Sequence, residues 1–237
     1  MHDGFDIPPP FFEIGPKAFL YGQGVLELAR AADRMSRRYD VRIIFTPQYV
    51  DIARVAAETR HIKVFAQHMD SIGIGRGIGS VLPEAVKEAG AVGVLLNHAE
   101  KRLSLSEINR TIKRADQVGL ATLVCADTPE EAAALAHLAP NIILAEPPEL
   151  IGSGETGAAG RDWVARINER IRSIDPRIRV LHSAGIRGPQ DVADIVALGA
   201  EATGCTSAVV KAEDPAAMLE AMIRAMREAW DKMHSRR

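Results

Sequence analysis

The chain has 237 residues, 47% of them hydrophobic, and a formal net charge of −2. This length and this apolar content suit a globular protein with a sizeable core, built either as one large α/β barrel or as two ordinary domains. The balanced charge, with Lys and Arg spread along the sequence, argues against a general role on nucleic acid or on membrane surfaces, so we expect neither as a partner.

Short apolar runs alternate with amphipathic helical segments along the whole sequence. In chain order, the predicted strands are Phe11–Gly15, Val41–Thr46, Ile62–Ala66, Val92–Leu96, Ala121–Val124, Ile142–Ala145, Val180–His182 and Ala200–Gly204. The predicted helices are Val25–Arg37, Val50–Glu58, Leu82–Glu88, Leu105–Gln117, Pro129–His137, Arg161–Ser173, Pro189–Leu198 and Pro215–Trp230. This number of strand–helix units closes a (β/α)8 barrel, and the chain has the usual length of that α/β fold.

The alternation continues without a linker rich in Pro, Gly or Ser, so we predict a single domain over residues 1–237. Residues 1–10 are expected to form an extended N-terminal arm, and residues 234–237 a flexible tail. A doubly wound open sheet is the alternative fold, and its glycine-rich fingerprint should follow the first strand. Gly22-Gln23-Gly24 stands there and does not fit that fingerprint.

Several function classes are excluded by what the sequence lacks. No apolar stretch reaches the length of a membrane-spanning helix, and the first residues do not follow the pattern of a signal peptide, so a cytoplasmic location is expected. The two cysteines, Cys125 and Cys205, match no zinc or redox motif and are expected to be free thiols. His68, Asp127 and His182 show no metal-ligand spacing, so we expect no metal site.

Polar residues follow most of the predicted strands, at the end of a barrel where active-site groups lie. They are Lys17, Gln67, His68, Asn97, His98, Glu100, Asp127, Glu146, Ser183 and Ser207. Taken singly, each has an ordinary interpretation, because a lone Lys is usually solvated and a lone His is often a packed imidazole. Their convergence on one end of the sheet favours an active site.

Glu146 and His98 carry the strongest signal. Glu146 stands between a buried strand and Pro147-Pro148, close to the turn Gly152-Ser153-Gly154. A carboxylate held in this way beside a glycine turn suits a catalytic base under a lid. His98 follows another buried strand at the corresponding edge. If both strands belong to one parallel sheet, an acid/base pair shares one face.

The motifs around these residues resemble the triosephosphate isomerase family in its short archaeal form. The two main matches are Val94–Arg102 and Ala145–Gly154, and shorter ones are Phe65–His68, Val81–Val86, Val124-Cys125 and Val209–Ala212. The resemblance runs in order over nearly the whole chain and implies the TIM-barrel fold. It implies that Glu146 is the base, His98 the electrophile and Lys17 the cation that meets the substrate. Glu100 would pair with that lysine, and Asn97 would support the site.

The resemblance also implies an activity. The chain would be a cofactor-independent aldose–ketose isomerase, an intramolecular oxidoreductase that interconverts glyceraldehyde 3-phosphate and dihydroxyacetone phosphate through an enediolate in glycolysis and gluconeogenesis. The protein would be a homo-oligomer, either a dimer or a tetramer. The substrate phosphate would be held by turns that offer backbone N–H groups, namely Gly152, Ser153, Gly154, Ser183, Ala184, Gly185, Thr206, Ser207 and Ala208.

The sequence departs from the family pattern in four loops. Gly15-Pro16-Lys17 stands where the family has Asn-x-Lys, and Ile78 stands where a family Thr reaches across a subunit boundary to that Asn. His182-Ser183 replaces Cys-Gly, and Thr206-Ser207-Ala208 replaces Ala-Ser-Gly. Because both partners of one polar contact are lost together, they are expected to have been exchanged for an apolar contact or for more room.

These departures leave two alternatives to the isomerase open. The chain is either the isomerase itself or a paralogue that acts on another short phosphorylated ketose, such as a tetrulose phosphate, with Gly15 and Ile78 reshaping the reacting end. A noncatalytic, ligand-binding barrel is the alternative from another class. An apolar Ile78 at a loop tip between glycines also predicts that this loop enters a pocket on a neighbouring subunit.

Overall fold

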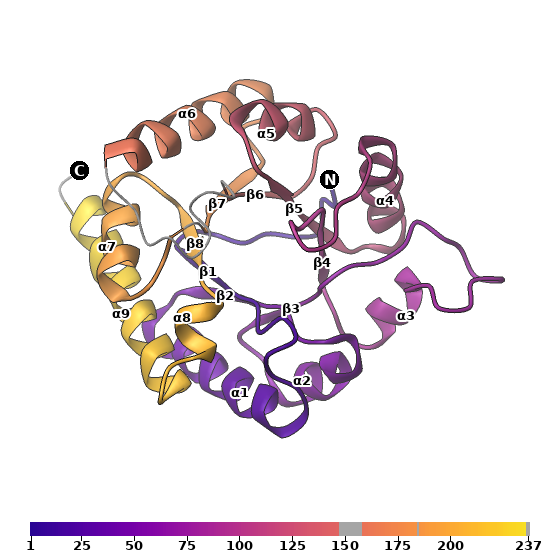
Figure 1. The fold of residues 1–237 in the computed structure, drawn as a ribbon, viewed down its shortest axis with the longest axis horizontal. Helices are drawn as coiled ribbons and strands as arrows, with labels where there is room; N and C mark the ends of the chain where they lie inside the picture. Colours follow the sequence, from indigo (N-terminus) through magenta and orange to yellow (C-terminus); the bar gives the residue numbers. More distant parts are fainter. Residues whose placement is uncertain (147–157, 184, 236–237) are drawn as a thin grey trace.

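The computed structural model describes residues 1–146, 158–183 and 185–235. Within them, parallel strands pair in sequence order and close into a barrel, because the last strand pairs with the first (Figure 1). The strands are β1 (Phe11–Ile14), β2 (Arg42–Phe45), β3 (Lys63–Ala66), β4 (Gly93–Leu96), β5 (Ala121–Ala126), β6 (Ile142–Ala145), β7 (Arg179–His182) and β8 (Ala202–Gly204). The prediction of a single-domain (β/α)8 barrel is therefore confirmed, and the open sheet is excluded.

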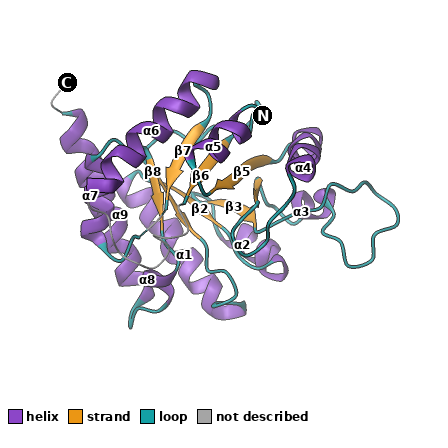
Figure 2. Ribbon diagram, turned by 45° about the horizontal axis from the view of Figure 1, so that its top comes forward, coloured by secondary structure: helices purple, strands orange, loops and turns teal. Residues whose placement is uncertain are grey.

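The helices form a ring outside the strands (Figures 1 and 2). They are α1 (Gly22–Tyr39), α2 (Ile52–Glu58), α3 (Pro83–Glu88), α4 (Leu105–Val118), α5 (Pro129–Ala136), α6 (Ala158–Ile174), α7 (Pro189–Ala197), α8 (Ser207–Val210) and α9 (Pro215–His234), with a 3-10 turn over Tyr49–Asp51. The predicted elements differ from these mainly by one to three residues at their ends. The short helix α8 was not predicted, because four residues are too few for a helical hydrophobic period.

Helix ends are set by local chemistry that the sequence carries. Ser104 and Glu107 form a reciprocal capping box at the start of α4, and Gly119 ends that helix with a φ of 74°. Thr128 caps α5 and Asp214 caps α9, each followed by a proline in the first turn. None of the helices that the structure describes is long and apolar enough to cross a membrane.

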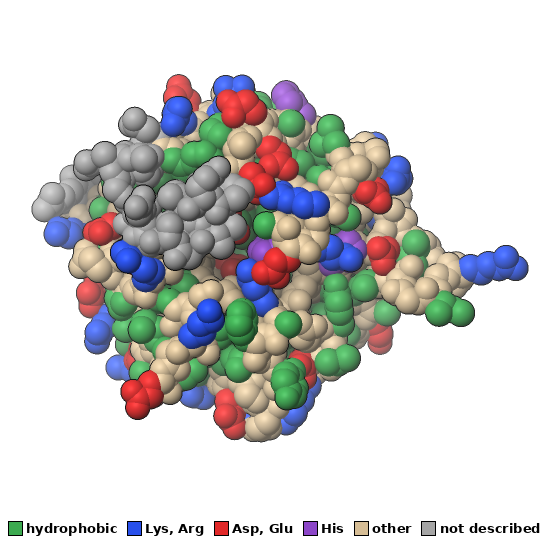
Figure 3. Space-filling view, in the orientation of Figure 1, with side chains coloured by type: hydrophobic (Ala, Val, Ile, Leu, Met, Phe, Trp, Pro, Cys, Tyr) green, Lys and Arg blue, Asp and Glu red, His purple; other side chains and the backbone are tan. Residues whose placement is uncertain are grey.

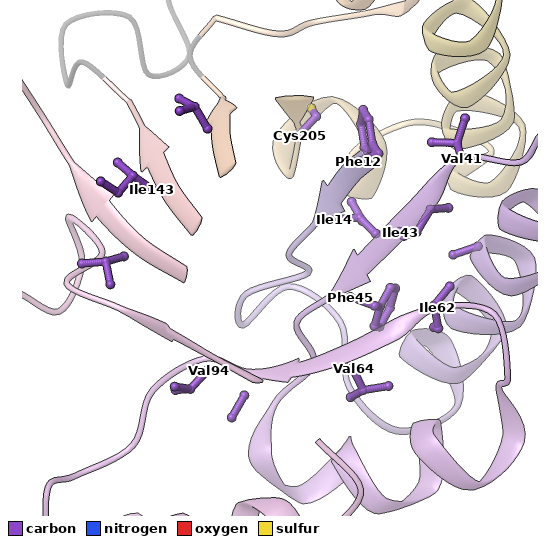
Figure 4. Packing of buried hydrophobic residues seen from close by; sticks show 14 of the residues in the cluster. Phe12, Ile14, Val41, Ile43, Phe45, Ile62, Val64, Val94, Ile143 and Cys205 are labelled. Carbon is purple, nitrogen blue, oxygen red and sulfur yellow. The ribbon is translucent and has the colours of Figure 1, made fainter. Parts of the chain in front are cut away.

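The strands separate two apolar layers. Side chains that point outward from the barrel pack against the helices, as Phe12, Ile43 and Val64 do in Figure 4. Side chains that point inward, among them Phe65 and Leu123, fill the barrel interior. Because side chains alternate along a strand, each strand contributes to both layers. This alternation brings the only charged residue of β1 into the barrel interior, as described below.

The N-terminal arm packs against the end of the barrel at which the strands begin. Ile7 is buried in the interior cluster, and the ring of Phe5 meets that of Phe65 edge-on, with 5.6 Å between centroids. The amino group of Met1 forms an ion pair with Asp116, at a nitrogen–oxygen distance of 2.7 Å. These contacts lie at the beginnings of the strands, so the carboxyl ends are left to form the site.

Candidate active site

A cavity of about 310 Å³ opens at the carboxyl ends of the strands. Its lining includes Lys17 after β1, His98 and Glu100 after β4, and Glu146 after β6. Acidic, basic and histidine side chains gather around the middle of this face in Figure 3. The structure therefore brings together charged residues that are up to 129 positions apart in the sequence, as the barrel topology predicts.

The protonation of His98 follows from one hydrogen bond. The backbone N–H of Glu100 donates to Nδ1 of His98 at 3.1 Å, so a neutral ring carries its proton on Nε2. Nε2 lies 3.9 Å from Oε2 of Glu146. Burial, and next the positive charge of Lys17, lower the pKa of His98 below its ordinary value. His98 is therefore neutral at physiological pH and presents an N–H donor toward the carboxylate.

Glu146 lies at the end of β6, where its backbone N–H donates to the carbonyl oxygen of Ala126 at 2.9 Å. Its side chain is 15% exposed. Burial raises the pKa of Glu146 to about 7, and the charge of Lys17 opposes that rise. A carboxyl group whose pKa lies near neutrality takes up and releases protons readily, which is the property that a general base requires.

Lys17 is held in a left-handed conformation, with a φ of 51°, that non-glycine residues rarely adopt. Its carbonyl oxygen accepts hydrogen bonds from the side-chain amides of Gln48, at 2.9 Å, and Gln67, at 3.2 Å. Its ammonium group forms an ion pair with Glu100 at 2.9 Å, and this hydrogen bond lowers the pKa of Glu100. The expected pairing of Lys17 with Glu100 is present, and the role of Gln48 was not predicted from the sequence.

Asn97 is buried and acts on the loop that carries His98. It too is left-handed, with a φ of 59°. Its side-chain amide donates to the carbonyl oxygen of Cys125, at 3.0 Å, and to Glu131, at 3.1 Å. Its side-chain oxygen accepts the backbone N–H of Leu103 at 3.0 Å. Asn97 thus ties the end of β4 to the end of β5 and fixes the start of the His98 loop.

The expected phosphate-binding residues are only partly described. Ser183, Gly185, Thr206 and Ser207 line the cavity, and Ala208 lies in the first turn of α8. The hydroxyl of Thr206 donates to the carbonyl oxygen of Gly15 at 2.7 Å, so its proton is directed at the backbone. Four further residues of that set lie outside the described part of the chain, namely Gly152, Ser153, Gly154 and Ala184.

The three polar residues that the sequence analysis considered as metal ligands lie outside the catalytic group. His68 meets Asp70 at 3.2 Å, and Asp127 forms an ion pair with Arg102. His182 is buried, with Nε2 3.0 Å from Oδ1 of Asn168, and burial lowers its pKa to about 3. Both cysteines are buried free thiols. The described residues contain no group of three or more His, Cys, Asp or Glu side chains arranged to hold a metal ion.

Glu13 lines the cavity and was not predicted as a site residue. It belongs to β1, faces the barrel interior and is only 5% exposed. The hydroxyl of Thr46 donates to its Oε1 at 3.0 Å. A Cβ atom on Gly15 would lie 2.8 Å from this Oε1 and 2.7 Å from Oγ1 of Thr46. The expectation that Gly15 leaves an apolar contact or more room is therefore wrong on this side, because polar groups fill the space.

The chain is similar to known proteins of one family. A family model described as triosephosphate isomerase matches residues 20–225. A triosephosphate isomerase of Methanosarcina barkeri is 42% identical over 218 residues, which cover 91% of this chain and 98% of the relative. One of Methanobacterium bryantii is 44% identical over 195 residues, which cover 82% of this chain and 86% of the relative.

Among solved structures, the barrel is similar to a crystal structure of triosephosphate isomerase from Bartonella henselae. The TM-score is 0.73 at 20% sequence identity, and the match covers 91% of this chain and 99% of that chain. At this identity the similarity concerns the fold alone, and it agrees with the closed barrel described above.

Proposed function

The chain belongs to the triosephosphate isomerase family, and we propose that it interconverts glyceraldehyde 3-phosphate and dihydroxyacetone phosphate through an enediolate. The observation that carries the proposal is the pairing of His98 and Glu146 across the cavity, with a proton on Nε2 of the histidine and 3.9 Å between Nε2 and the carboxylate oxygen. Isomerisation of an adjacent aldehyde and alcohol needs a base and a hydrogen-bond donor in this relation.

Glu146 acts as the base. Its carboxylate removes a proton from the carbon next to the substrate carbonyl, which leaves an enediolate and a neutral Glu146. The same carboxyl group then returns a proton to the neighbouring carbon, so that the carbonyl moves by one position and the enzyme is regenerated. A pKa of about 7 serves both steps, since the ionised form accepts the proton and the neutral form gives it up.

His98 acts as the electrophile, a role already known for the histidine of this enzyme family. Its Nε2–H donates a hydrogen bond to the carbonyl oxygen, where negative charge develops, and proton exchange with the ring carries a proton between the two oxygens. The lowered pKa keeps the ring neutral. Lys17 adds a positive charge beside the same oxygens, and the amides of Gln48 and Gln67 fix the backbone that places it.

The phosphate group is assigned to the turns after β7 and β8, where Ser183, Gly185, Thr206 and Ser207 line the cavity. Such turns bind anions through backbone N–H groups rather than through arginine side chains. The assignment of Gly152, Ser153 and Gly154 to the same task rests on the resemblance, since these residues lie outside the described part of the chain.

A tetrulose phosphate is the second candidate substrate, because Glu13 and Thr46 form a polar floor beside Gly15 that offers hydrogen-bonding groups to a further hydroxyl of the ligand. The test is the turnover of purified protein on a panel of three- to five-carbon phosphosugars. We expect the highest kcat/KM on triose phosphate. A higher value on a four-carbon substrate would replace the first candidate by the second, and binding without turnover on any member would point to a noncatalytic barrel.

A further inference from the structure

Glu13 is a second carboxyl group in the cavity, and the mechanism above does not use it. Two glycines make room for it. A Cβ atom on Gly15 would lie 2.8 Å from its Oε1, and one on Gly204 would lie 3.1 Å from its Oε2. A side chain at Gly15 would displace the carboxyl group, and one at Gly204 would also crowd the backbone carbonyl oxygen of Glu13, at 2.8 Å. The end of β1 and the neighbouring β8 are thus shaped around this group at the floor of the cavity.

Few protein groups replace the hydrogen bonds to water that the carboxyl group of Glu13 loses on burial. Among the described residues, the hydroxyl of Thr46 is the only side chain that hydrogen-bonds to Glu13, and it uses Oε1 alone. Burial raises the pKa of Glu13 to about 7, the hydrogen bond from Thr46 lowers it, and of the nearby charges Glu146 raises it while Lys17 lowers it. Two further titratable groups lie close by, the buried thiols of Cys125 and Cys205, and burial raises the pKa of each. At neutral pH a large fraction of the carboxyl groups therefore carry a proton.

A protonated carboxyl group has an O–H donor that needs an acceptor when it is buried. Glu13 lines the same cavity as His98 and Glu146, so a ligand in that cavity can supply the acceptor. Hydroxyl and carbonyl oxygens of a phosphosugar suit this donor, whereas an alkyl chain leaves it without a partner. A pocket that hydrogen-bonds a substrate oxygen discriminates strongly against analogues that lack it.

We propose that the Glu13 carboxyl group hydrogen-bonds an oxygen atom of the sugar portion of the ligand and so selects phosphosugars by their pattern of oxygens. This inference rests on the proposed function for the class of ligand. It assigns Glu13 to binding of the sugar portion at the floor of the cavity. The turns after β7 and β8 have the separate role of holding the phosphate.

The test compares two ligands that share a phosphate and differ in hydroxyl groups, glycerol 3-phosphate and propyl phosphate, by titration calorimetry. Glu13→Leu keeps the side-chain volume and removes the hydrogen-bonding group. It should weaken the binding of glycerol 3-phosphate by about three- to tenfold, the range of one neutral hydrogen bond, and leave that of propyl phosphate within about twofold. Glu13→Gln keeps a donor for the ligand and an acceptor for Thr46, so it should retain most of the preference.

The control is Glu201→Leu, because Glu201 lies before β8 at the opposite end of the barrel, where it pairs with Arg172 and Arg179. It should leave both affinities unchanged. If Glu13→Leu does not fold, Glu13→Met makes the same comparison. The proposal is wrong if the leucine or methionine variant keeps the wild-type preference, if it weakens both ligands equally, or if Glu13→Gln loses the preference as fully as they do.

The isomerase assay on the same preparations keeps the two claims apart. A wild-type protein that binds both ligands and isomerises no phosphosugar would remove the proposed function, whatever the affinity ratio is. If the wild-type protein isomerises triose phosphate, and Glu13→Leu leaves the ratio of the two ligand affinities unchanged, only the proposed role of Glu13 is wrong.

Discussion

At the rim of the cavity, His98 and Glu146 lie in the first two residues after β4 and β6, whereas at the floor Glu13 lies within β1. The rim residues belong to loops, so we expect changes of their side chains to leave the barrel packing intact. The floor residue belongs to the pleated sheet and is surrounded by Thr46 and by two glycines. Chemistry placed at the rim can therefore vary without changes in the core, while chemistry at the floor is coupled to the packing of neighbouring strands.

The largest expected effect is at the rim. Glu146→Asp withdraws the carboxylate by one methylene group from the proton that it removes, and a displacement of this size should lower kcat on the order of 10²-fold. The fold and the affinity for a substrate analogue should be retained, because the substituted group lies outside the packed core. Steady-state kinetics and calorimetry measure the two quantities.

Glu201→Asp makes the same change of one methylene group at the other end of the barrel and should leave kcat unaltered. Near-normal turnover in a correctly folded Glu146→Asp variant would remove Glu146 from the role of base.

The floor should respond in stability rather than in chemistry. An asparagine at position 15 brings its Cβ atom within 3 Å of Glu13 and Thr46, so Gly15→Asn should lower the free energy of unfolding by about 1–3 kcal/mol. Combining Gly15→Asn with Glu13→Ala should recover part of this loss, because the shortened side chain vacates the space. Chemical denaturation of the wild type, the two single variants and the double variant gives the coupling free energy between positions 13 and 15.

Gly188→Asn is the matched control, since a Cβ atom there meets no atom within 4 Å. If the effects of Gly15→Asn and Glu13→Ala on the free energy of unfolding are additive, the floor is not coupled to the packing of the strands.

The rim, unlike the floor, is expected to be completed by a second copy of the chain. The loop between β3 and α3 extends far from the barrel in Figure 2, and both Ile74 and Ile78 in it are exposed. Because an apolar loop tip needs a partner, the wild-type protein should be a dimer or a tetramer, and Ile78→Asp should lower the mass in light scattering by at least half.

Leu105→Asp changes another exposed apolar residue, at the start of α4, and should leave the mass unaltered. A monomeric wild-type protein over a wide concentration range would show that the rim is complete within one chain.

The smallest expected effect is a pH dependence of stability. The pKa of Glu13 is raised from 4.5 to about 7, so the folded protein binds more protons than the unfolded chain between these values. Stability should therefore fall as the pH rises from about 4.5 to 7. Glu13→Gln removes this titration and should reduce the fall of Tm between pH 5 and pH 8 by a few degrees.

Glu146, at the rim, has a similarly raised pKa of about 7. Because the pH dependence of stability follows from the shift of the pKa, Glu146→Gln should reduce the fall of Tm to a similar extent. A fall of Tm that neither variant reduces would contradict the raised pKa values of the two carboxyl groups.

The difference between rim and floor also explains which site residues could be predicted from the sequence. The barrel and the rim residues could be predicted because the apolar runs alternate with helical segments and most of them are followed by a polar residue. Lys17, His98, Glu100 and Glu146 do line one cavity. The apolar pattern predicts Glu13 only as part of the strand Phe11–Gly15. A single acidic residue within that run was the available signal, but its partner Thr46 is 33 positions away, and only the strand register brings the two together.

The most direct test of the proposed reaction is isomerisation of triose phosphate in deuterated water, followed by NMR. If Glu146 removes a proton from carbon and returns it to the neighbouring carbon, part of that hydrogen should exchange with solvent while it is on the carboxyl group. We expect deuterium on carbon in the product, formed at a rate that falls steeply in Glu146→Asp. Turnover without any deuterium on carbon would contradict the enediolate, and no turnover would contradict the isomerase.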